Sequence, residues 1–383
     1  MKRSEHRILV THQGTLPRPD EVRALVSAKS QGQPYDKEAL ASAVRTGVAD
    51  AVKRQAEIGI DIVNDGELSK TSFSDYVSDR LGGLEPTSEP YVSPISGRDL
   101  KEFPEYFDTS RAFGARNVGL RRVVYQCTGP ITYVGQANLQ ADIENFKAAL
   151  QGQNVEEAYL PAVAPGSIEH WLKNAYYPDE ETFLYAIGEA MAVEYRAIVD
   201  AGFILQIDDP DLADGWQVHP DLDLDGYRKV ARLRTDVLNH ALRGLPEDRV
   251  RLHMCWGSYH GPHKYDLPLR DFVDIVLSAH TGAYSIEAAN PRHLHEWRVW
   301  EDVRLPEGKS LIPGVVGHYS DFVEHPEVVA ERLVQYAGVV GKENVIAGTD
   351  CGLGTRVGHA KIAWAKLQSL VEGARLASKQ LWS

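Results

Sequence analysis

Apolar positions follow a helical spacing in several parts of the chain. Val48 and Val52 stand four residues apart, which places them on one face of a helix. Asp36 precedes this run in the position of an N-terminal cap, and Gly59 follows it where a glycine commonly ends a helix. A similar pattern begins at Pro326, a residue that the first helical turn tolerates. These patterns predict amphipathic helices with one buried face.

Short apolar runs of strand length alternate with the predicted helices. Eight of them are joined by helix-length connections, at 8–12, 60–64, 123–128, 203–208, 251–255, 283–287, 311–316 and 345–349. Eight parallel strands with helical crossovers are typical of a (β/α)8 TIM barrel, an α/β fold. A doubly wound open sheet is the alternative. A ninth run, 157–163, we interpret as an insertion near the barrel mouth.

Residues 73–121 interrupt this alternation. The segment is rich in Tyr, Phe, Gly, Pro and Ser and has no clear period, so it predicts an excursion after the second strand. The chain has 383 residues, and α/β barrels commonly exceed about 250 residues as one unit. We therefore expect a single barrel domain over residues 1–383, with 73–121 as a wall or lid over the site.

Composition and charge exclude some partners. Apolar residues make up 43% of the chain and charged residues 25%, which is typical of a globular protein. The formal charge of −13 would repel an extended phosphate backbone, so we expect no nucleic-acid partner. The chain has neither a signal-like start nor a run of about 18 apolar residues, and we expect a cytoplasmic protein with no membrane partner. A homo-oligomer is left open.

The cysteines indicate a metal site. Three scattered cysteines are too few for a disulfide framework, and we expect Cys127 to be a small buried residue. His253 and Cys255 are two apart in a predicted strand and therefore point to the same side. Glu287 and Cys351 stand at the ends of two other strands. Together, these four residues, His253, Cys255, Glu287 and Cys351, offer ligand types that zinc accepts.

Further polar residues follow the predicted strands. Active sites of TIM barrels lie at the carboxyl ends of their strands, where this chain carries Glu67, Asp208 and Asp350. Glu67 and Asp208 either hold a substrate or pair with arginines at the barrel rim. His318 follows the strand 311–316 and is our candidate proton donor, with a packing histidine as the alternative.

These motifs together resemble the cobalamin-independent methionine synthase family, specifically its catalytic carboxyl-terminal barrel. The resemblance rests on separated motifs in the family's order, at 11–17, 64–67, 128–130, 206–208, 253–255, 287 and 350–352. It implies that His253, Cys255, Glu287 and Cys351 match the zinc ligands. It also implies that Thr15, Glu67 and Asp208 match positions that hold an amino-acid thiol.

The chain resembles the short, single-barrel members of this family. Residues 255–263 and 291–297 are similar to the branch that contains epoxyalkane:coenzyme M transferases. The implied function is a zinc-dependent thiol alkyltransferase, in which a small thiol attacks a methyl or alkyl donor. The alternatives are epoxide opening by a thiol, a non-enzymatic barrel with structural zinc, and a metal-free, decarboxylase-like barrel.

Two details bear on the substrates. Relatives that use methyl-folate carry a tryptophan after the Thr-Gly-Pro motif, where this chain has Gln136, with Tyr133 as a nearby aromatic substitute. Because loss of stacking weakens binding of a flat ring, we expect weak use of methyl-folate. Arg18, Lys70 and Arg292 are candidates to bind an anionic thiol such as a sulfonate.

Overall fold

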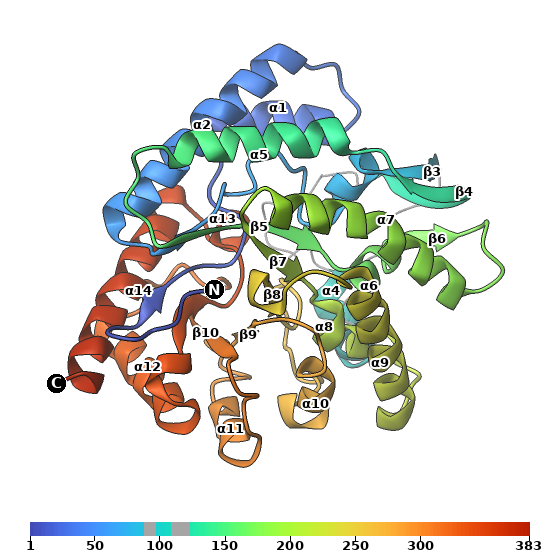
Figure 1. The fold of residues 1–383 in the computed structure, drawn as a ribbon. Coiled ribbons are helices and arrows are strands. Elements are labelled where there is room, and N and C mark those ends of the chain that lie inside the picture. The colour runs from blue at the N-terminus through green and yellow to red at the C-terminus, as the bar shows by residue number, and fades with distance from the viewer. Residues whose placement is uncertain (88–96, 109–122) are drawn as a thin grey trace.

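The computed structural model describes residues 1–87, 97–108 and 123–383. Eight parallel strands form one sheet in the order β1-β11-β10-β9-β8-β7-β5-β2. A bridge between Thr11 and Ile62 joins the two ends of this sheet and closes it. The strands are β1 (Leu9–Val10), β2 (Ile62–Val63), β5 (Glu157–Val163), β7 (Ile204–Asp208), β8 (Val250–Met254), β9 (Ala283–Glu287), β10 (Ser310–Val316) and β11 (Ile346–Thr349). The predicted TIM barrel is confirmed (Figure 1).

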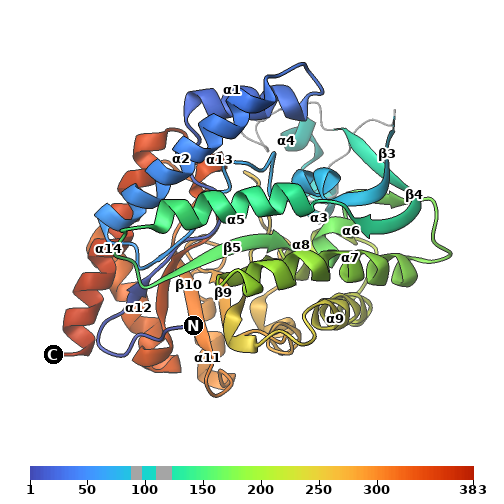
Figure 2. The same cartoon turned by 45° about the horizontal axis from the view of Figure 1, so that its top comes forward.

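Helices form a ring around the outside of the strands (Figures 1 and 2). The helices of this ring are α2 (Lys37–Ile58), α5 (Gln136–Leu150), α7 (Glu180–Asp200), α9 (Leu224–Ala241), α10 (Val273–Val276), α11 (Val299–Asp302), α12 (Pro326–Val340) and α14 (Ala360–Leu381). Helices in the connections are α1 (Asp20–Ser30), α6 (Pro165–Glu169), α8 (Asp211–Val218) and α13 (Leu353–Arg356). Short 3-10 turns are η1 (Asp75–Asp79), η2 (Glu247–Arg249), η3 (Leu269–Asp271), η4 (Glu296–Arg298) and η5 (Lys342–Asn344).

The predicted helix ends are confirmed where the sequence signals were strongest. The Asp36 carboxylate accepts hydrogen bonds from the backbone N–H groups of Glu38 and Ala39 and so caps α2. Gly59 ends this helix with φ +94°, a left-handed conformation that glycine adopts without steric cost. Helix α12 begins at Pro326 as predicted.

The prediction for the third barrel strand is wrong. Residues 157–163 form β5, which lies between β2 and β7 in the barrel rather than in an insertion. Residues 123–128 instead fall largely within β4 (Val124–Tyr133), which lies outside the barrel. The difference is visible in burial, because residues 159–163 of β5 are all buried whereas most residues of β4 are partly exposed. A strand in a parallel barrel is covered on both faces, and only β5 meets that requirement.

Beside the barrel lies a small sheet of three strands, at the same edge of the molecule in both views (Figures 1 and 2). Strand β4 pairs antiparallel with β3 (Leu81–Thr87) and parallel with β6 (Leu172–Asn174). The expected excursion 73–121 also contains α3 (Gly97–Glu102) and α4 (Pro104–Asp108). The rest of that prediction falls on residues 88–96 and 109–121, which lie outside the described residues.

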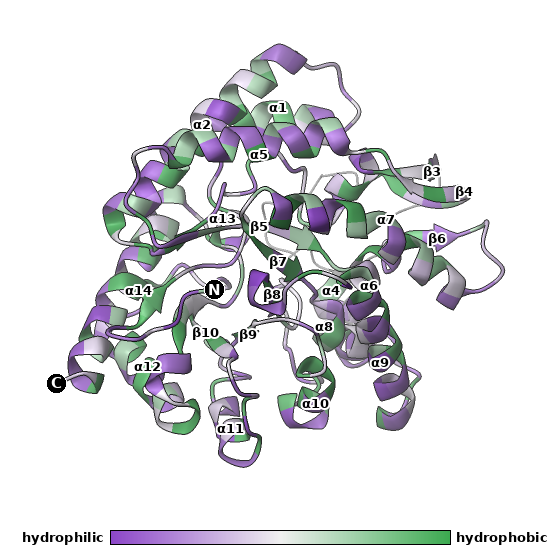
Figure 3. Cartoon of the chain, in the orientation of Figure 1, coloured by the Kyte–Doolittle hydropathy of each residue, from purple (hydrophilic) through white to green (hydrophobic). Residues whose placement is uncertain are grey.

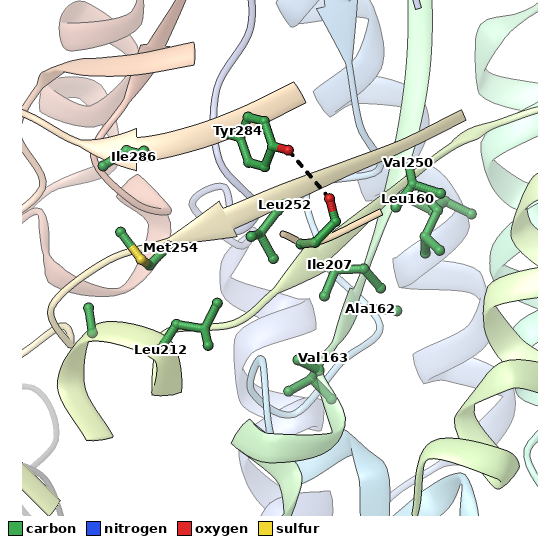
Figure 4. Packing of buried hydrophobic residues seen from close by; sticks show 14 of the residues in the cluster. Leu160, Ala162, Val163, Ile207, Leu212, Val250, Leu252, Met254, Tyr284 and Ile286 are labelled. Atoms are coloured by element: carbon green, nitrogen blue, oxygen red, sulfur yellow. Dashed lines mark hydrogen bonds between the residues drawn. The ribbon is translucent and has the colours of Figure 1, made fainter. Parts of the chain in front are cut away.

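Two apolar clusters stabilise the barrel. The larger one fills the space between strands and helices and includes Leu160, Val163, Ile207, Leu252 and Met254 (Figure 4). The smaller one combines one residue from each of seven strands, namely Leu9, Ile62, Tyr159, Ile204, Ala283, Ile312 and Ile346. Because these side chains come from seven strands and form a separate cluster, we place them inside the barrel.

Polar side chains lie on the outer helices (Figure 3) and at the carboxyl ends of the strands. Hydrophilic and hydrophobic residues alternate around the outer helices, as expected for helices with one buried face (Figure 3). Within the described residues, the helices are too short or too polar to cross a membrane. The carboxyl ends of the strands carry buried polar groups, among them Asp208 and His253.

Candidate functional site

Three of the predicted metal ligands come together at the carboxyl ends of the strands. Ligand atoms of His253, Cys255 and Cys351 all lie within 4.8 Å of one another. His253 belongs to β8 and Cys255 follows that strand, whereas Cys351 lies two residues beyond β11. Since β9 and β10 separate these two strands in the sheet, the side chains meet across the barrel mouth. The group could hold a metal ion.

The electrostatics of this group fit a cation. Contact with Cys255 lowers the pKa of Cys351 well below its ordinary value, while contact with Cys351 raises the pKa of Cys255 well above its own. The two sulfur atoms therefore resist carrying two negative charges at once. Both ring nitrogens of His253 are buried and make no hydrogen bond of ordinary geometry among the described residues, although Cys351 lies close enough to raise the pKa of the ring. A cation would satisfy the ring nitrogen and balance the charge on sulfur.

Glu287, the fourth predicted ligand, is the last residue of β9, next to β8 in the sheet. Its Oε2 accepts a hydrogen bond from the backbone N–H of Trp256 at 2.9 Å. Its Oε1 is buried and has no hydrogen-bond partner within the described part of the chain. Glu287 is outside the group of three, and its role as a ligand stays a prediction.

Asp350 connects the loops that carry two of the predicted ligands. Its Oδ1 accepts hydrogen bonds from the backbone N–H groups of Ala288 and Ala289, each at 2.7 Å. Gly314 makes this approach feasible, because a Cβ there would come within 2.6 Å of Asp350. The sequence placed Asp350 at a strand end without assigning it this role. The carboxylate fixes the residue after Glu287 relative to the residue before Cys351.

His318 lies two residues beyond β10 and is fully buried. Burial lowers its pKa, so the ring is largely neutral at neutral pH. Its Nε2 lies 2.9 Å from Oγ of Ser258, and the same hydroxyl donates to Sγ of Cys351 at 3.4 Å. The structure therefore places His318 one hydroxyl group away from a predicted ligand. Ser258 is not among the predicted site residues, although it stands only three residues after Cys255.

Thr15 and Glu67 follow the paired strands β1 and β2, and Asp208 ends β7, which β5 separates from β2. Thr15 Oγ1 donates to Glu67 Oε1 at 3.1 Å, and Asp208 is in register with His253 on the adjacent strand. Burial and the charge of Glu67 raise the pKa of Asp208 to about 7. Glu67 has φ +53°, a conformation that costs a non-glycine residue about 1–3 kcal/mol. The fold thus buries the carboxyl groups of both Glu67 and Asp208 at the barrel mouth.

The three basic residues proposed for an anionic thiol already contact other groups of the protein. Arg18 donates to the backbone carbonyls of Glu67 and Lys70, and Arg292 donates to that of Lys264. The ammonium group of Lys70 donates to the carbonyl of Pro161 at 2.6 Å and lies 3.6 Å from Glu67 Oε2. These contacts give the sulfonate hypothesis no support.

The region proposed for the donor offers little stacking surface. Gln136 is exposed at the start of α5, where its Nε2 donates to the carbonyl of Tyr133. The Tyr133 hydroxyl donates to Glu194 Oε2 at 2.7 Å, which ties this ring to α7. Weak use of methyl-folate stays a prediction.

A buried polar network supports the loop after Cys255. Asp266 Oδ2 lies 2.7 Å from Nδ1 of His263 and 3.0 Å from Nε2 of His293. The ring of His293 stacks on Trp256 with centroids 3.8 Å apart. Trp256 in turn donates its backbone N–H to Glu287. The network therefore helps to position the predicted oxygen ligand.

The inserted segment reaches this loop as well. The carboxylate of Asp99 in α3 accepts hydrogen bonds from the Tyr259 hydroxyl at 3.0 Å and from the backbone N–H of Tyr265 at 3.2 Å. Tyr106 in α4 donates its hydroxyl to the carbonyl of His260. The described part of the segment therefore packs against the loop that follows Cys255, and its role as a wall or lid stays a prediction.

A second group of ligand-type side chains lies nearby, which the sequence did not indicate. Ligand atoms of His170, Asp211 and Asp214 lie within 4.8 Å of one another. His170 Nδ1 is 2.6 Å from Asp211 Oδ1, and Arg234 forms an ion pair with the other oxygen of Asp211. Because these basic groups already face Asp211, we read the group as a buried ion-pair network.

Comparison with known proteins identifies relatives. A family model described as "Cobalamin-independent synthase, Catalytic domain" matches residues 165–376, more than half of the chain. Methionine synthase from Thermococcus kodakarensis is 22% identical over 369 residues, which cover 96% of this chain and 93% of the relative. Methionine synthase from Sulfolobus acidocaldarius is 23% identical over 371 residues, which cover 96% and 91%.

Solved structures share the fold. A B12-independent methionine synthase from Shewanella sp. W3-18-1, in complex with selenomethionine, has a TM-score of 0.76 at 20% identity, covering 98% of this chain and 99% of that one. A putative vitamin-B12-independent methionine synthase from Listeria monocytogenes has a TM-score of 0.66 at 17% identity, covering 96% and 98%. Both matches extend over nearly the whole barrel.

Proposed function

Because the chain belongs to the cobalamin-independent methionine synthase family, we propose that it is a zinc-dependent enzyme that transfers a methyl or alkyl group to the sulfur of a small thiol. One observation carries this proposal. His253, Cys255 and Cys351, which come from separate parts of the sequence, converge within 4.8 Å at the end of the barrel that carries active sites. Two buried carboxyl groups, those of Glu67 and Asp208, lie at the same mouth.

The donor set fits zinc. His253, Cys255 and Cys351 supply one nitrogen and two sulfur atoms, and Glu287 would add an oxygen. When bound, zinc would hold the substrate sulfur as a thiolate at neutral pH, where a free thiol with a pKa of about 8.5 is mostly protonated. Glu287 is the ligand we expect to yield its place to the substrate, because sulfur binds zinc well. The Trp256 N–H would keep the displaced carboxylate in position.

Glu67 and Asp208 would select a thiol that carries an amine. Burial and, after it, the charge of Glu67 raise the pKa of Asp208, whereas the nearby Lys70 lowers it. The ammonium group of a substrate would add a second positive charge beside the two carboxyl groups and so favour their ionised forms. Thr15 orients Glu67 through its hydroxyl group. A thiol with an amine, such as homocysteine, therefore suits the site better than a sulfonate thiol.

His318 would supply a proton to the group that leaves the alkyl carbon. A departing nitrogen or oxygen leaves poorly as an anion and needs such a donor. His318 is buried next to the sulfur ligands, away from bulk water. Because the resting ring is neutral, it would first take up a proton, such as the one that the thiol releases on binding zinc, and its lowered pKa would then make it a stronger acid than an exposed histidine.

The proposal is tested by product formation. Reduced, zinc-loaded protein would be incubated with homocysteine or 2-mercaptoethanesulfonate, each paired with 5-methyltetrahydrofolate or a small epoxide, and alkylated thiol measured by mass spectrometry. We expect alkylation of the amino thiol, and a Glu67→Gln variant that keeps its metal but loses this preference. Alkylation of the sulfonate thiol alone would favour the epoxide branch. No product from any pair, with zinc bound, would point to a structural metal.

A further inference from the structure

The hydroxyl group of Ser258 connects two predicted functional residues. Its Oγ is 2.9 Å from Nε2 of His318 and donates to Sγ of Cys351 at 3.4 Å. Gly257 precedes it with φ +81°, a left-handed conformation that lets the chain turn back toward the mouth. Tyr319, the neighbour of His318, donates its hydroxyl to the carbonyl of Gly257 at 2.7 Å. The two loops are therefore held together on both sides of this contact.

The direction of these hydrogen bonds follows from proton counting. A serine hydroxyl carries one proton and can donate only once, whereas its oxygen can also accept. The hydroxyl group of Ser258 donates to Sγ of Cys351, so its one proton is used in that contact. The oxygen of Ser258 must then accept from Nε2–H of His318. This arrangement selects one neutral tautomer of His318, with its proton on Nε2 and none on Nδ1.

The side chain of Ser258 differs from those of most serines near turns in its hydrogen-bond partners. Across the described residues, its side chain makes hydrogen bonds only to His318 and Cys351, and none to a backbone group. Turn and cap serines, by contrast, usually bond to a nearby backbone group. The hydroxyl group is therefore committed to the two functional side chains.

We propose that Ser258 is a positioning residue, which fixes the tautomer and orientation of His318 relative to the sulfur of Cys351. This inference rests on the proposed thiol alkyltransferase function and deepens it. Through Ser258, the proton on Nε2 of His318 is kept beside the sulfur ligand, where the reacting thiol and its donor must meet. Partners of metal ligands act in this way on orientation and donor strength.

A set of variants tests the kinetic part of the proposal. Ser258→Ala should keep its zinc and lower kcat by about 10–100-fold, the scale seen for such partners of metal ligands, with KM for the thiol little changed. Ser258→Thr keeps the hydroxyl and should restore most of kcat. Ser285→Ala is a matched control, because it removes a buried hydroxyl in register with His253 that has no hydrogen-bond partner among the described residues.

A double-variant cycle distinguishes positioning from a general structural effect. If Ser258 acts through His318, Ser258→Ala should cause no further loss of kcat in a His318→Gln background. Full kcat in Ser258→Ala would overturn the proposal. Losses that multiply in the double variant would also overturn it, because they would show that the two residues act independently.

A measurement without substrates separates this inference from the proposed function. Nitrogen-15 NMR of reduced, histidine-labelled protein reports which ring nitrogen carries the proton, and His318→Gln identifies the signal. We expect Nε2–H in the parent and a changed tautomer ratio in Ser258→Ala. An Nδ1–H tautomer in the parent would overturn the inference. If the expected NMR result came from a protein that alkylates no thiol, the proposed function alone would fail.

Discussion

Oδ1 of Asp350 lies 2.7 Å from the backbone nitrogen of Ala288 and accepts its hydrogen bond. Asp350 immediately precedes the predicted ligand Cys351, and Ala288 immediately follows the predicted ligand Glu287. One carboxylate therefore fixes the spacing between the two strand ends. A second bond, from Ala289 to the same oxygen, reinforces the link.

Loss of this link should destabilise the protein. Asp350→Ala leaves two buried N–H groups unpaired, and we expect the free energy of unfolding to fall by about 1–3 kcal/mol for each unpaired donor. Urea denaturation measures the change. Asp350→Asn keeps Oδ1 as an acceptor and is the matched control, with a smaller loss expected. Equal stability of Asp350→Ala and the parent would contradict this account of the link.

His318→Gln should separate binding from turnover. Because His318 is outside the group of three ligands, zinc content and thiol binding should change little. Turnover should fall by about 100-fold or more, the scale for loss of a general acid. Steady-state kinetics and metal analysis check both parts. Turnover at the parental rate would mean that another group delivers the proton.

Affinity for an amino thiol should depend on pH through Asp208. Burial and the charge of Glu67 raise its pKa to about 7, so the carboxylate becomes neutral as the pH falls below that value. Only the ionised form attracts an ammonium group, and KM for an amino thiol should therefore rise as the pH falls through about 7.

A thiol without an amine provides the control for this effect. Coordination of any thiol to zinc releases a proton, so some pH dependence is common to all thiols. The extra dependence of the amino thiol belongs to the carboxyl groups and should disappear in Asp208→Asn. Identical pH profiles for both thiols in the parent would argue against Asp208 as the amine's partner.

The barrel was predictable from the sequence because each helix and strand carries its own local signal. Asp36, Gly59 and Pro326 mark helix ends through backbone chemistry that does not depend on the rest of the fold. The third strand was mistaken because residues 123–128 and 157–163 are both apolar runs of similar length. Only burial on both faces separates them, and burial depends on the tertiary structure.

The same distinction between local signals and tertiary contacts holds for the site. Histidine and cysteines at strand ends are visible in the sequence because a parallel barrel brings all carboxyl ends to one mouth. The contacts of Ser258 and Asp350 were not visible, since they join loops 60 or more residues apart. The engagement of Arg18 and Arg292 by backbone carbonyls is equally a property of the folded loops.

Metal content should depend on the two cysteines that meet at the mouth. Cys255→Ser and Cys351→Ser each replace a thiolate with a weak neutral ligand, and we expect each variant to lose most of about one zinc per chain. Cys127→Ser is the control, because Cys127 is buried in β4 of the separate three-stranded sheet and is not part of this group. Elemental analysis that finds full zinc in both variants would show that Cys255 and Cys351 are not the zinc ligands.

Zinc K-edge X-ray absorption, recorded with and without an amino thiol, shows whether the metal binds the reacting sulfur. We expect the thiol to add one sulfur to the zinc shell and to remove one oxygen, because Glu287 yields its place to the substrate. The same change should be absent in Glu67→Gln at low thiol concentration, since that variant lacks one of the two carboxyl groups proposed to bind the amine. An identical zinc shell with and without saturating thiol would instead show that the metal is structural and that the thiol is activated elsewhere.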